Sequence, residues 1–193
     1  MRVLVLFAHP VETSFVAEAH RVAVEALIEA GHDVDDCDLY AEGFDAVLSR
    51  QERLDYHDLD RNRKNVEGYV ERVMSAEALL LVHPVWNFGF PAILKGFFDR
   101  VFLPGVSFRL VDGGVRPNLH NIRKLGAIVT YGGHRWRARL AGDPPRKILK
   151  RVIRAVIHPD ARTRYIALYD MNRNGDAERR AFLEKIAAEM RRF

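Results

Sequence analysis

Short, almost fully apolar runs recur along the chain and are separated by longer stretches in which apolar and polar positions alternate in blocks. The clearest runs are residues 3–8, 78–82 and 125–130. Because consecutive positions are apolar in these runs, they are typical of strands buried on both faces of a parallel sheet. Residues 32–39 and 163–169 predict two further strands.

The first stretch between strands has the spacing of an amphipathic helix. Thr13 or Ser14 is placed to cap this helix, and Gly31 to end it. Its apolar face would comprise Phe15, Ala19, Val22, Ala26 and Ala30, and its polar face Glu18, Arg21, Glu25 and Glu29.

Three more helices are predicted, at residues 65–75, 90–102 and 177–191. Residues 40–64 read as a long charged connection with one short helix at most, and residues 105–118 as a loop or hairpin. Apolar strands that alternate with amphipathic helices predict an α/β fold, a doubly wound parallel sheet in three layers.

We expect one domain over residues 1–193, because the chain contains no repeat and no linker-like segment. Ligands of doubly wound folds bind beyond the carboxyl ends of the strands. The candidate site therefore lies in the segments that follow three predicted strands, at residues 9–15, 84–90 and 130–136.

Composition narrows the setting. The apolar run at residues 3–8 is far shorter than the roughly 20 residues of a membrane span, and no signal-peptide cleavage site follows it. The single cysteine, Cys37, cannot form an internal disulfide, and no His/Cys spacing indicates a metal site. We therefore expect a reducing, cytoplasmic setting and no bound metal.

Charge divides the chain into two unlike halves. Residues 1–100 hold 10 Lys and Arg against 18 Asp and Glu, whereas residues 101–193 hold 20 against 8. The basic excess peaks at residues 135–154, where Asp143 is the only acid among eight cations. Such a stretch can attract nucleic acid, an anionic membrane or a phosphorylated small molecule. A solvated helical face with a few paired arginines is an equally good reading.

The first candidate segment lacks the Gly-x-Gly-x-x-Gly pattern of classical dinucleotide-binding domains. It offers the hydroxyls of Thr13 and Ser14, the imidazole of His9 and the free N–H groups of a helix start, which together suit one phosphate dianion. In the alternative reading Thr13 and Ser14 only cap the helix, and His9 is an ordinary surface residue.

The other two segments favour a flat ligand. Trp86, Phe88 and Phe90 gather at the carboxyl end of a buried strand, where a flavin would cover them. Core packing of Trp86 and Phe90 is the alternative. Gly132 and Gly133 follow the next strand and would let the backbone approach a ligand closely.

The three segments together resemble the flavodoxin-like NAD(P)H:quinone reductases, the family of DT-diaphorase and the potassium-efflux-associated reductases. The resemblance rests on Ala8-His9-Pro10 with Thr13-Ser14-Phe15, on residues 84–102 (PVWNFGFPAILKGFFDRVF), and on Thr130-Tyr131-Gly132-Gly133. It implies a five-stranded flavodoxin-like sheet of order 2-1-3-4-5 and a homodimer with two sites at its interface. It also implies a bound FMN or FAD that NAD(P)H reduces.

The resemblance also assigns roles to residues. His9, Thr13, Ser14 and Phe15 match the part that holds the flavin phosphate. Pro84, Val85, Trp86, Asn87 and Phe88 match the loop along the isoalloxazine ring, and Thr130, Tyr131, Gly132 and Gly133 the loop at its pyrimidine edge. Phe108 falls where some relatives place an aromatic that closes the pocket from the partner subunit.

The loop after Gly133 is shorter than in the mammalian-type reductases, which carry there a tyrosine and a histidine thought to assist hydride transfer. His134 and Trp136 are candidates for these catalytic roles, although they are not positional matches.

We therefore predict an NAD(P)H dehydrogenase that passes two electrons to a quinone or similar acceptor, with no nucleic-acid partner. The short chain favours FMN over FAD. Two alternatives remain: a flavodoxin-type electron carrier, and an ancillary flavoprotein that docks on a membrane transporter through residues 135–154.

Overall fold

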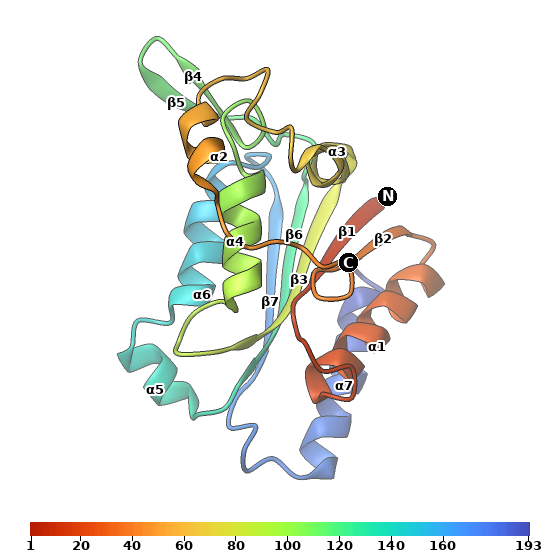
Figure 1. Ribbon diagram of the computed structural model, residues 1–193. Coiled ribbons are helices and arrows are strands. Elements are labelled where there is room, and N and C mark those ends of the chain that lie inside the picture. The colour runs from red at the N-terminus through yellow and green to blue at the C-terminus, as the bar shows by residue number, and fades with distance from the viewer.

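A five-stranded parallel sheet forms the centre of the computed structural model, which describes residues 1–193, and helices cover both of its faces (Figure 1). The strands are β1 (Arg2–Phe7), β2 (Asp33–Asp38), β3 (Ala78–Val85), β6 (Lys124–Tyr131) and β7 (Arg162–Leu168). Their order is β2-β1-β3-β6-β7. Counted along the chain this is 2-1-3-4-5, so the predicted α/β fold with a doubly wound sheet is confirmed.

Two apolar cores lie on opposite faces of the sheet because successive side chains of a strand point to opposite sides. From β1, Val3, Val5 and Phe7 pack against α1 (Phe15–Glu29) and α7 (Asp176–Met190). Leu4 and Leu6 contribute to the other core, with α3 (Glu67–Ser75) and α4 (Ala92–Val101). Burial on both faces explains why the sequence of β1 is apolar without alternation.

The N-cap of α1 is one that the sequence allows, but the residues that this helix buries differ in part from the predicted apolar face. Ser14 is the N-cap, and its Oγ accepts a hydrogen bond of 3.2 Å from the N–H of Ala17. The fully buried residues are Val16, Ala19, Ala23, Ala26 and Leu27. The predicted apolar face was therefore wrong at Ala30, which is exposed, whereas Phe15 and Val22 are partly buried and pack against the core. Because α1 packs against α7 as well as against the sheet, its buried face is wider than the helical period of the sequence predicts.

The long charged connection contains the short helix α2 (Arg50–Asp55), which Ser49 and Glu52 close with a capping box. Two contacts hold the connection on α4. Arg100 is 7% exposed and pairs with Glu52 at 2.5 Å. Gly96 lies against the backbone of Ala46, where a Cβ at position 96 would overlap it. The glycine is therefore required by this close approach.

The remaining elements lie around the far end of α4 and beyond β6. The predicted loop or hairpin is a hairpin, β4 (Phe108–Val111) paired antiparallel with β5 (Gly114–Pro117). The basic stretch folds into α5 (Arg135–Leu140), α6 (Pro144–Lys147), η1 (Ile148–Val152) and η2 (Ile153–Ala155). None of the helices combines the length and apolar character that crossing a membrane requires.

Candidate functional site

The three candidate segments meet at the carboxyl edge of the sheet because β1, β3 and β6 are direct neighbours. The ring of His9 lies 5.7 Å from that of Trp86, which joins the first segment to the second. Phe88 and Gly132 line one hollow of about 260 Å³, which joins the second to the third. We call residues 9–16 and 85–89 the open edge.

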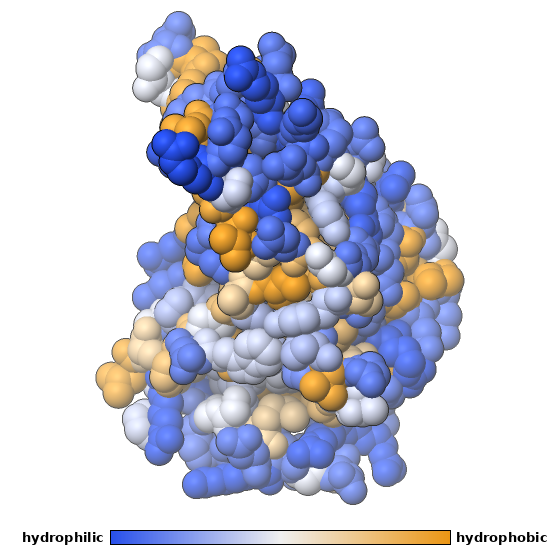
Figure 2. Space-filling view, in the orientation of Figure 1, coloured by the Kyte–Doolittle hydropathy of each residue, from blue (hydrophilic) through white to orange (hydrophobic).

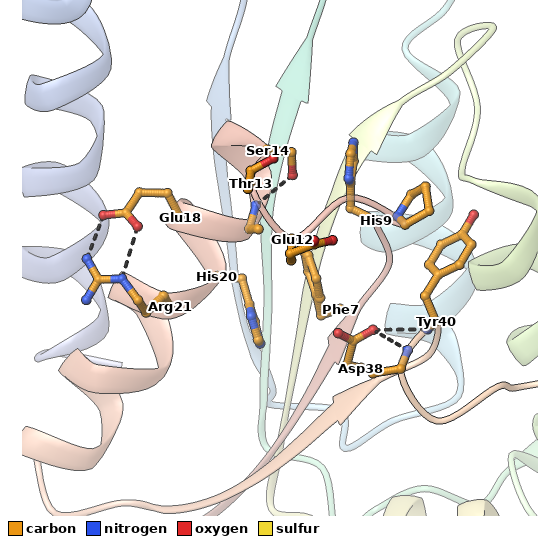
Figure 3. Close-up of a pocket in the computed structure, with 13 residues that line it drawn as sticks. Phe7, His9, Glu12, Thr13, Ser14, Glu18, His20, Arg21, Asp38 and Tyr40 are labelled. Atoms are coloured by element: carbon orange, nitrogen blue, oxygen red, sulfur yellow. Dashed lines mark hydrogen bonds and ion pairs between the residues drawn. The ribbon is translucent and has the colours of Figure 1, made fainter.

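A larger hollow of about 620 Å³ lies beside the start of α1 (Figure 3). The N–H groups of Thr13, Phe15 and Val16 donate no hydrogen bond within the protein. Free N–H groups at the positive end of a 15-residue helix are suited to a phosphate dianion. The donor set therefore fits the phosphate of a flavin.

Three carboxylates also border this hollow, those of Glu12, Glu18 and Asp38, and only Glu18 forms an ion pair. Glu18 faces Arg21 in Figure 3, and their closest side-chain atoms are 2.6 Å apart. The hydrogen bond from Arg21 lowers the pKa of Glu18. Glu18 is therefore held by its own helix, and Oδ1 of Asp38 accepts the backbone N–H groups of Tyr40 and Ala41.

Fewer side chains of the first segment, residues 9–15, are free to bind a ligand than the sequence indicates. The Oγ of Ser14 accepts the capping hydrogen bond, in line with the alternative in which this residue only caps the helix. Nδ1 of His9 accepts a hydrogen bond of 3.0 Å from the N–H of Val11. Phe15 packs against Phe182 between α1 and α7, with ring centroids 6.2 Å apart. Its backbone N–H, not its ring, is thus the group available at the helix start.

The second segment is an exposed and strained turn. Trp86 and Gly89 are bonded to each other through their backbones, and Asn87 and Phe88 between them have φ values of 48° and 59°. Left-handed backbone costs roughly 1–2 kcal/mol for a residue with a side chain. The residues Trp86 and Phe88 are nonetheless 40% and 45% exposed. Strain combined with exposed aromatic surface is characteristic of a binding loop.

His83, which sequence reasoning did not select, supports this turn from below. It is fully buried, its Nδ1 lies 2.8 Å from the carbonyl of Pro84, and its ring packs edge-to-face on Phe90. Burial lowers the pKa of His83 to about 4, so the ring is neutral and Nδ1–H donates to Pro84. Phe90 is partly buried and packs against the core, in line with the alternative reading, whereas Trp86 is exposed.

The third segment presents two exposed glycines after Thr130 and Tyr131. A Cβ at Gly132 would lie 3.5 Å from the Asn172 side chain, and one at Gly133 would lie 3.9 Å from Arg137. These are ordinary contacts, and neither glycine has a positive φ. The chain itself therefore does not require glycine here, whereas a ligand lying close to the backbone would.

Tyr131 belongs instead to a hydrogen-bonded cluster that the sequence did not reveal. Its hydroxyl donates to Oδ1 of Asp143 at 2.6 Å and accepts from the hydroxyl of Tyr165 at 2.5 Å. Arg146 donates to Oδ2 of Asp143 and to the hydroxyl of Tyr169, both at 2.8 Å. Burial raises the pKa of Tyr131 and of Tyr165. We call these five residues the locked corner.

The three catalytic candidates lie in different places. His134 borders the hollow of Phe88, where its Nδ1 lies 3.2 Å from Asp170 and its Nε2 2.9 Å from Arg173. The arginine can only donate, so the neutral ring carries its proton on Nδ1. Trp136 is 59% exposed and borders none of these hollows. Phe108 lines a separate apolar hollow of about 350 Å³. One chain therefore brings only His134 to the candidate site.

No group of three or more His, Cys, Asp or Glu side chains is arranged to hold a metal ion. The site's donors are instead backbone N–H groups and aromatic rings, which suit an organic ligand with a phosphate.

A family model with a flavodoxin-like fold, Flavodoxin_2, matches residues 1–191. The chain is 31% identical to the solved structure of Smu.1420 from Streptococcus mutans, with both chains fully covered and a TM-score of 0.85. It is 27% identical to the NAD(P)H:quinone oxidoreductase of Methanothermobacter marburgensis, covering 99% of this chain and 96% of that one, with a TM-score of 0.83.

Curated relatives match over a shorter length. NAD(P)H dehydrogenase (quinone) 1 of Cavia porcellus is 34% identical over 68% of this chain and 54% of its own. FMN-dependent NADH:quinone oxidoreductase 2 of Bacillus cereus is 31% identical over 69% of this chain and 58% of its own. The alignments thus span little more than half the length of these two relatives.

Proposed function

Because this chain belongs to the flavodoxin-like family described by Flavodoxin_2, we propose that it is a flavin-dependent NAD(P)H dehydrogenase that delivers two electrons to a quinone or similar acceptor. One observation carries the proposal: free helix N–H groups, exposed aromatic rings and open glycines meet at one edge of the sheet. The names of two similar proteins, from Methanothermobacter marburgensis and Cavia porcellus, support the reaction class.

We propose FMN as the cofactor. The hollow beside α1 offers donors for one phosphate, from the N–H groups of Thr13, Phe15 and Val16 and the hydroxyl of Thr13. A Bacillus cereus relative is named FMN-dependent, which supports this choice over FAD. When bound, the flavin supplies a group that accepts a hydride and returns two electrons.

The protein itself would position the flavin and the substrate and would exclude water from them. Trp86 and Phe88 would cover the flat ring, and the open backbone at Gly132 and Gly133 would let N–H groups stabilise negative charge that develops on it. His134, fixed by Asp170 and Arg173, would orient a substrate at the mouth of the hollow. The remaining residues matched to the cofactor, His9, Pro84, Val85, Asn87, Thr130 and Tyr131, would hold these loops in place.

A homodimer is also part of the proposal. Phe98, Phe102 and Val152 line an apolar hollow between α4 and η1. Figure 2 shows separate apolar patches among hydrophilic side chains on the side of the molecule that has α4 in front. A second copy that covers this face would bury Phe108, which lines the same hollow, and could bring that ring to a partner's site. Sedimentation analysis tests the assignment, because replacing the exposed Val152 with glutamate should yield monomers. A protein that is already monomeric contradicts it.

The cellular location and the number of domains are also part of the proposal. The buried thiol of Cys37 has no partner cysteine, which supports a reducing, cytoplasmic location. One continuous sheet with a core on each face supports a single domain over residues 1–193.

The decisive experiment is to purify the protein, identify its released flavin by chromatography and follow NAD(P)H oxidation with a quinone. A flavodoxin-type carrier would bind flavin without oxidising NAD(P)H. An ancillary transporter protein would instead co-sediment with its partner through residues 135–154. Absence of both flavin and turnover contradicts the proposal.

The order of substrates provides a second test. Nicotinamide and quinone are both flat and must both lie about 3–3.5 Å from the reacting atoms, so they cannot occupy the one site at the same time. Double-reciprocal plots should be parallel, and truncation of Trp86, Phe88 or Phe108 should slow both half-reactions. Intersecting lines would indicate separate binding sites.

A further inference from the structure

The strongest unassigned feature is a hollow of about 310 Å³ beside α5, which we call the basic hollow. Four of the side chains that line it are cations, Arg135, Arg139, Arg146 and Lys147, and Asp143 is its only acid. Nothing in the proposed flavin site uses these cations.

The local charges leave this hollow strongly positive. Both carboxylate oxygens of Asp143 are already bonded, one to the hydroxyl of Tyr131 and the other to Arg146. Arg135, Arg139 and Lys147 form no ion pair within the protein. Three uncompensated cations around one concavity raise the local concentration of anions.

The path of the backbone brings the four cations of the basic hollow together. Arg135 and Arg139 lie one turn apart on α5, so they share a face. The chain then turns at Gly142, where φ is 84° and a Cβ would lie only 3.1 Å from Nζ of Lys147. This glycine lets the ammonium group lie close to the turn. The locked corner fixes Arg146 beneath it.

The basic hollow and the proposed flavin site lie on two sides of the same short helix. Arg137 and Ala138 of α5 line the hollow of Phe88 and Gly132, whereas Arg135 and Arg139 line the basic hollow. A helix with its side chains is about 10–12 Å across, which is shorter than an extended dinucleotide. A dinucleotide that reacts over the flavin can therefore place its far end among these cations.

We propose that the basic hollow binds the 2′-phosphate of NADPH and makes NADPH the preferred reductant. This inference rests on the proposed function. A phosphate monoester carries nearly two charges and accepts charge-assisted hydrogen bonds from guanidinium and ammonium groups. NADH has a hydroxyl at the same position and gains none of these bonds.

Calorimetry with nucleotide fragments tests the site without turnover. The probes are 2′,5′-ADP, which carries the 2′-phosphate, 5′-ADP and 5′-AMP, which lack it, and inorganic phosphate. We expect 2′,5′-ADP to bind the flavin-loaded protein at least tenfold more tightly than any of the others. Equal binding of 5′-ADP would mean that a pyrophosphate is recognised, and equal binding of inorganic phosphate that any anion is. Either result overturns the proposal.

The matched variants are Arg139→Gln with Lys147→Gln, and, as a control, Lys150→Gln with Arg151→Gln. The control removes the same charge from exposed positions of the same segment outside the hollow. The first pair should weaken 2′,5′-ADP at least tenfold and raise KM for NADPH but not for NADH, while the control changes neither. Similar losses in both pairs, or for both reductants, overturn the proposal.

Failure here is distinguishable from failure of the proposed function. If the protein oxidises neither reductant, the proposed function is wrong whatever the calorimetry shows. If it oxidises both equally well and the Arg139 and Lys147 variants leave their KM values unchanged, the function stands and the 2′-phosphate site does not.

Discussion

The open edge and the locked corner lie at the same end of the sheet, but they differ in hydrogen bonding. Backbone donors at the open edge lack partners, whereas the polar side chains of the locked corner are bonded to one another. At the open edge the N–H groups of Thr13, Phe15 and Val16 have no partner, and Phe88 is exposed on strained backbone. In the locked corner, hydroxyl, carboxylate and guanidinium groups are bonded to one another within 2.5–2.8 Å.

The difference separates binding from stability. Unpaired donors and strained turns lower the stability of the isolated protein, but they are available to a ligand. A cluster that satisfies its own hydrogen bonds is unavailable to a ligand, but it fixes the elements that carry it. We therefore expect substitutions in the two regions to change different measurements.

The largest effect is expected for Ser14→Asp at the open edge. Aspartate is as good an N-cap as serine, so the fold should remain, but its charge would repel a phosphate at the helix start. Flavin affinity should fall by about a hundredfold or more, measured as flavin per protein after gel filtration. Ser14→Asn, a neutral cap, is the control and should keep its flavin. Full occupancy of Ser14→Asp would remove the phosphate assignment.

The next effect concerns acid stability and His83 beneath the turn. Its folded pKa of about 4 lies below the unfolded value of 6.5, so the unfolded state takes up the proton first as pH falls. Stability should decline between pH 6.5 and 4 by about 3 kcal/mol in total from this group. His83→Phe should remove that part of the decline in urea unfolding.

His57→Phe is the control for this prediction, because the ring of His57 is exposed. It should follow the pH profile of the parent protein. A His83→Phe profile parallel to that of the parent would contradict the assignment of a neutral buried ring.

A smaller loss is expected in the locked corner. Asp143→Asn keeps a side chain that tolerates left-handed backbone, but it presents an amide where Tyr131 and Arg146 both donate. The free energy of unfolding should fall by about 2 kcal/mol, with flavin affinity much less affected. Asp112→Asn is the matched control, since Asp112 also has a positive φ but is exposed and unpaired. Equal effects of the two changes would show that the cluster adds no stability.

The smallest effect separates strain from contact at Phe88. Phe88→Gly should relieve the left-handed backbone and raise the free energy of unfolding by up to about 1 kcal/mol, while turnover falls. Phe88→Ala removes the same ring but keeps the strain, so it should lower turnover without any gain in stability. A gain of similar size in Phe88→Ala would mean that the exposed ring, not the backbone, is the unfavourable feature.

Strands and loops near the site were predictable because their signals are local. Consecutive apolar residues such as Val3 to Phe7 require burial on both faces, which only an internal parallel strand provides. The helix cap at Ser14 follows from its side chain and its place before an amphipathic stretch.

The locked corner was not predictable for the opposite reason. Asp143 follows α5, whereas Tyr165 and Tyr169 lie on and after β7, so their contacts depend on tertiary packing. The only sequence signal was that Asp143 is the single acid in a basic stretch. For Phe15 the helical period predicted a place on the apolar face, but not its contact with Phe182, which lies far away in sequence.

The order of the strands has a consequence for synthesis of the chain. On the ribosome β2, β1 and β3 emerge first, and the outer edge of β3 has no partner until β6 follows residues 86–123. At roughly 5–20 residues per second, this leaves an apolar strand edge exposed for a few seconds. Leu79, Leu80 and Leu81 lie on that strand and would be the first residues to pair wrongly with another nascent chain. We therefore expect overproduction to yield aggregates that slower translation or a holding chaperone reduces.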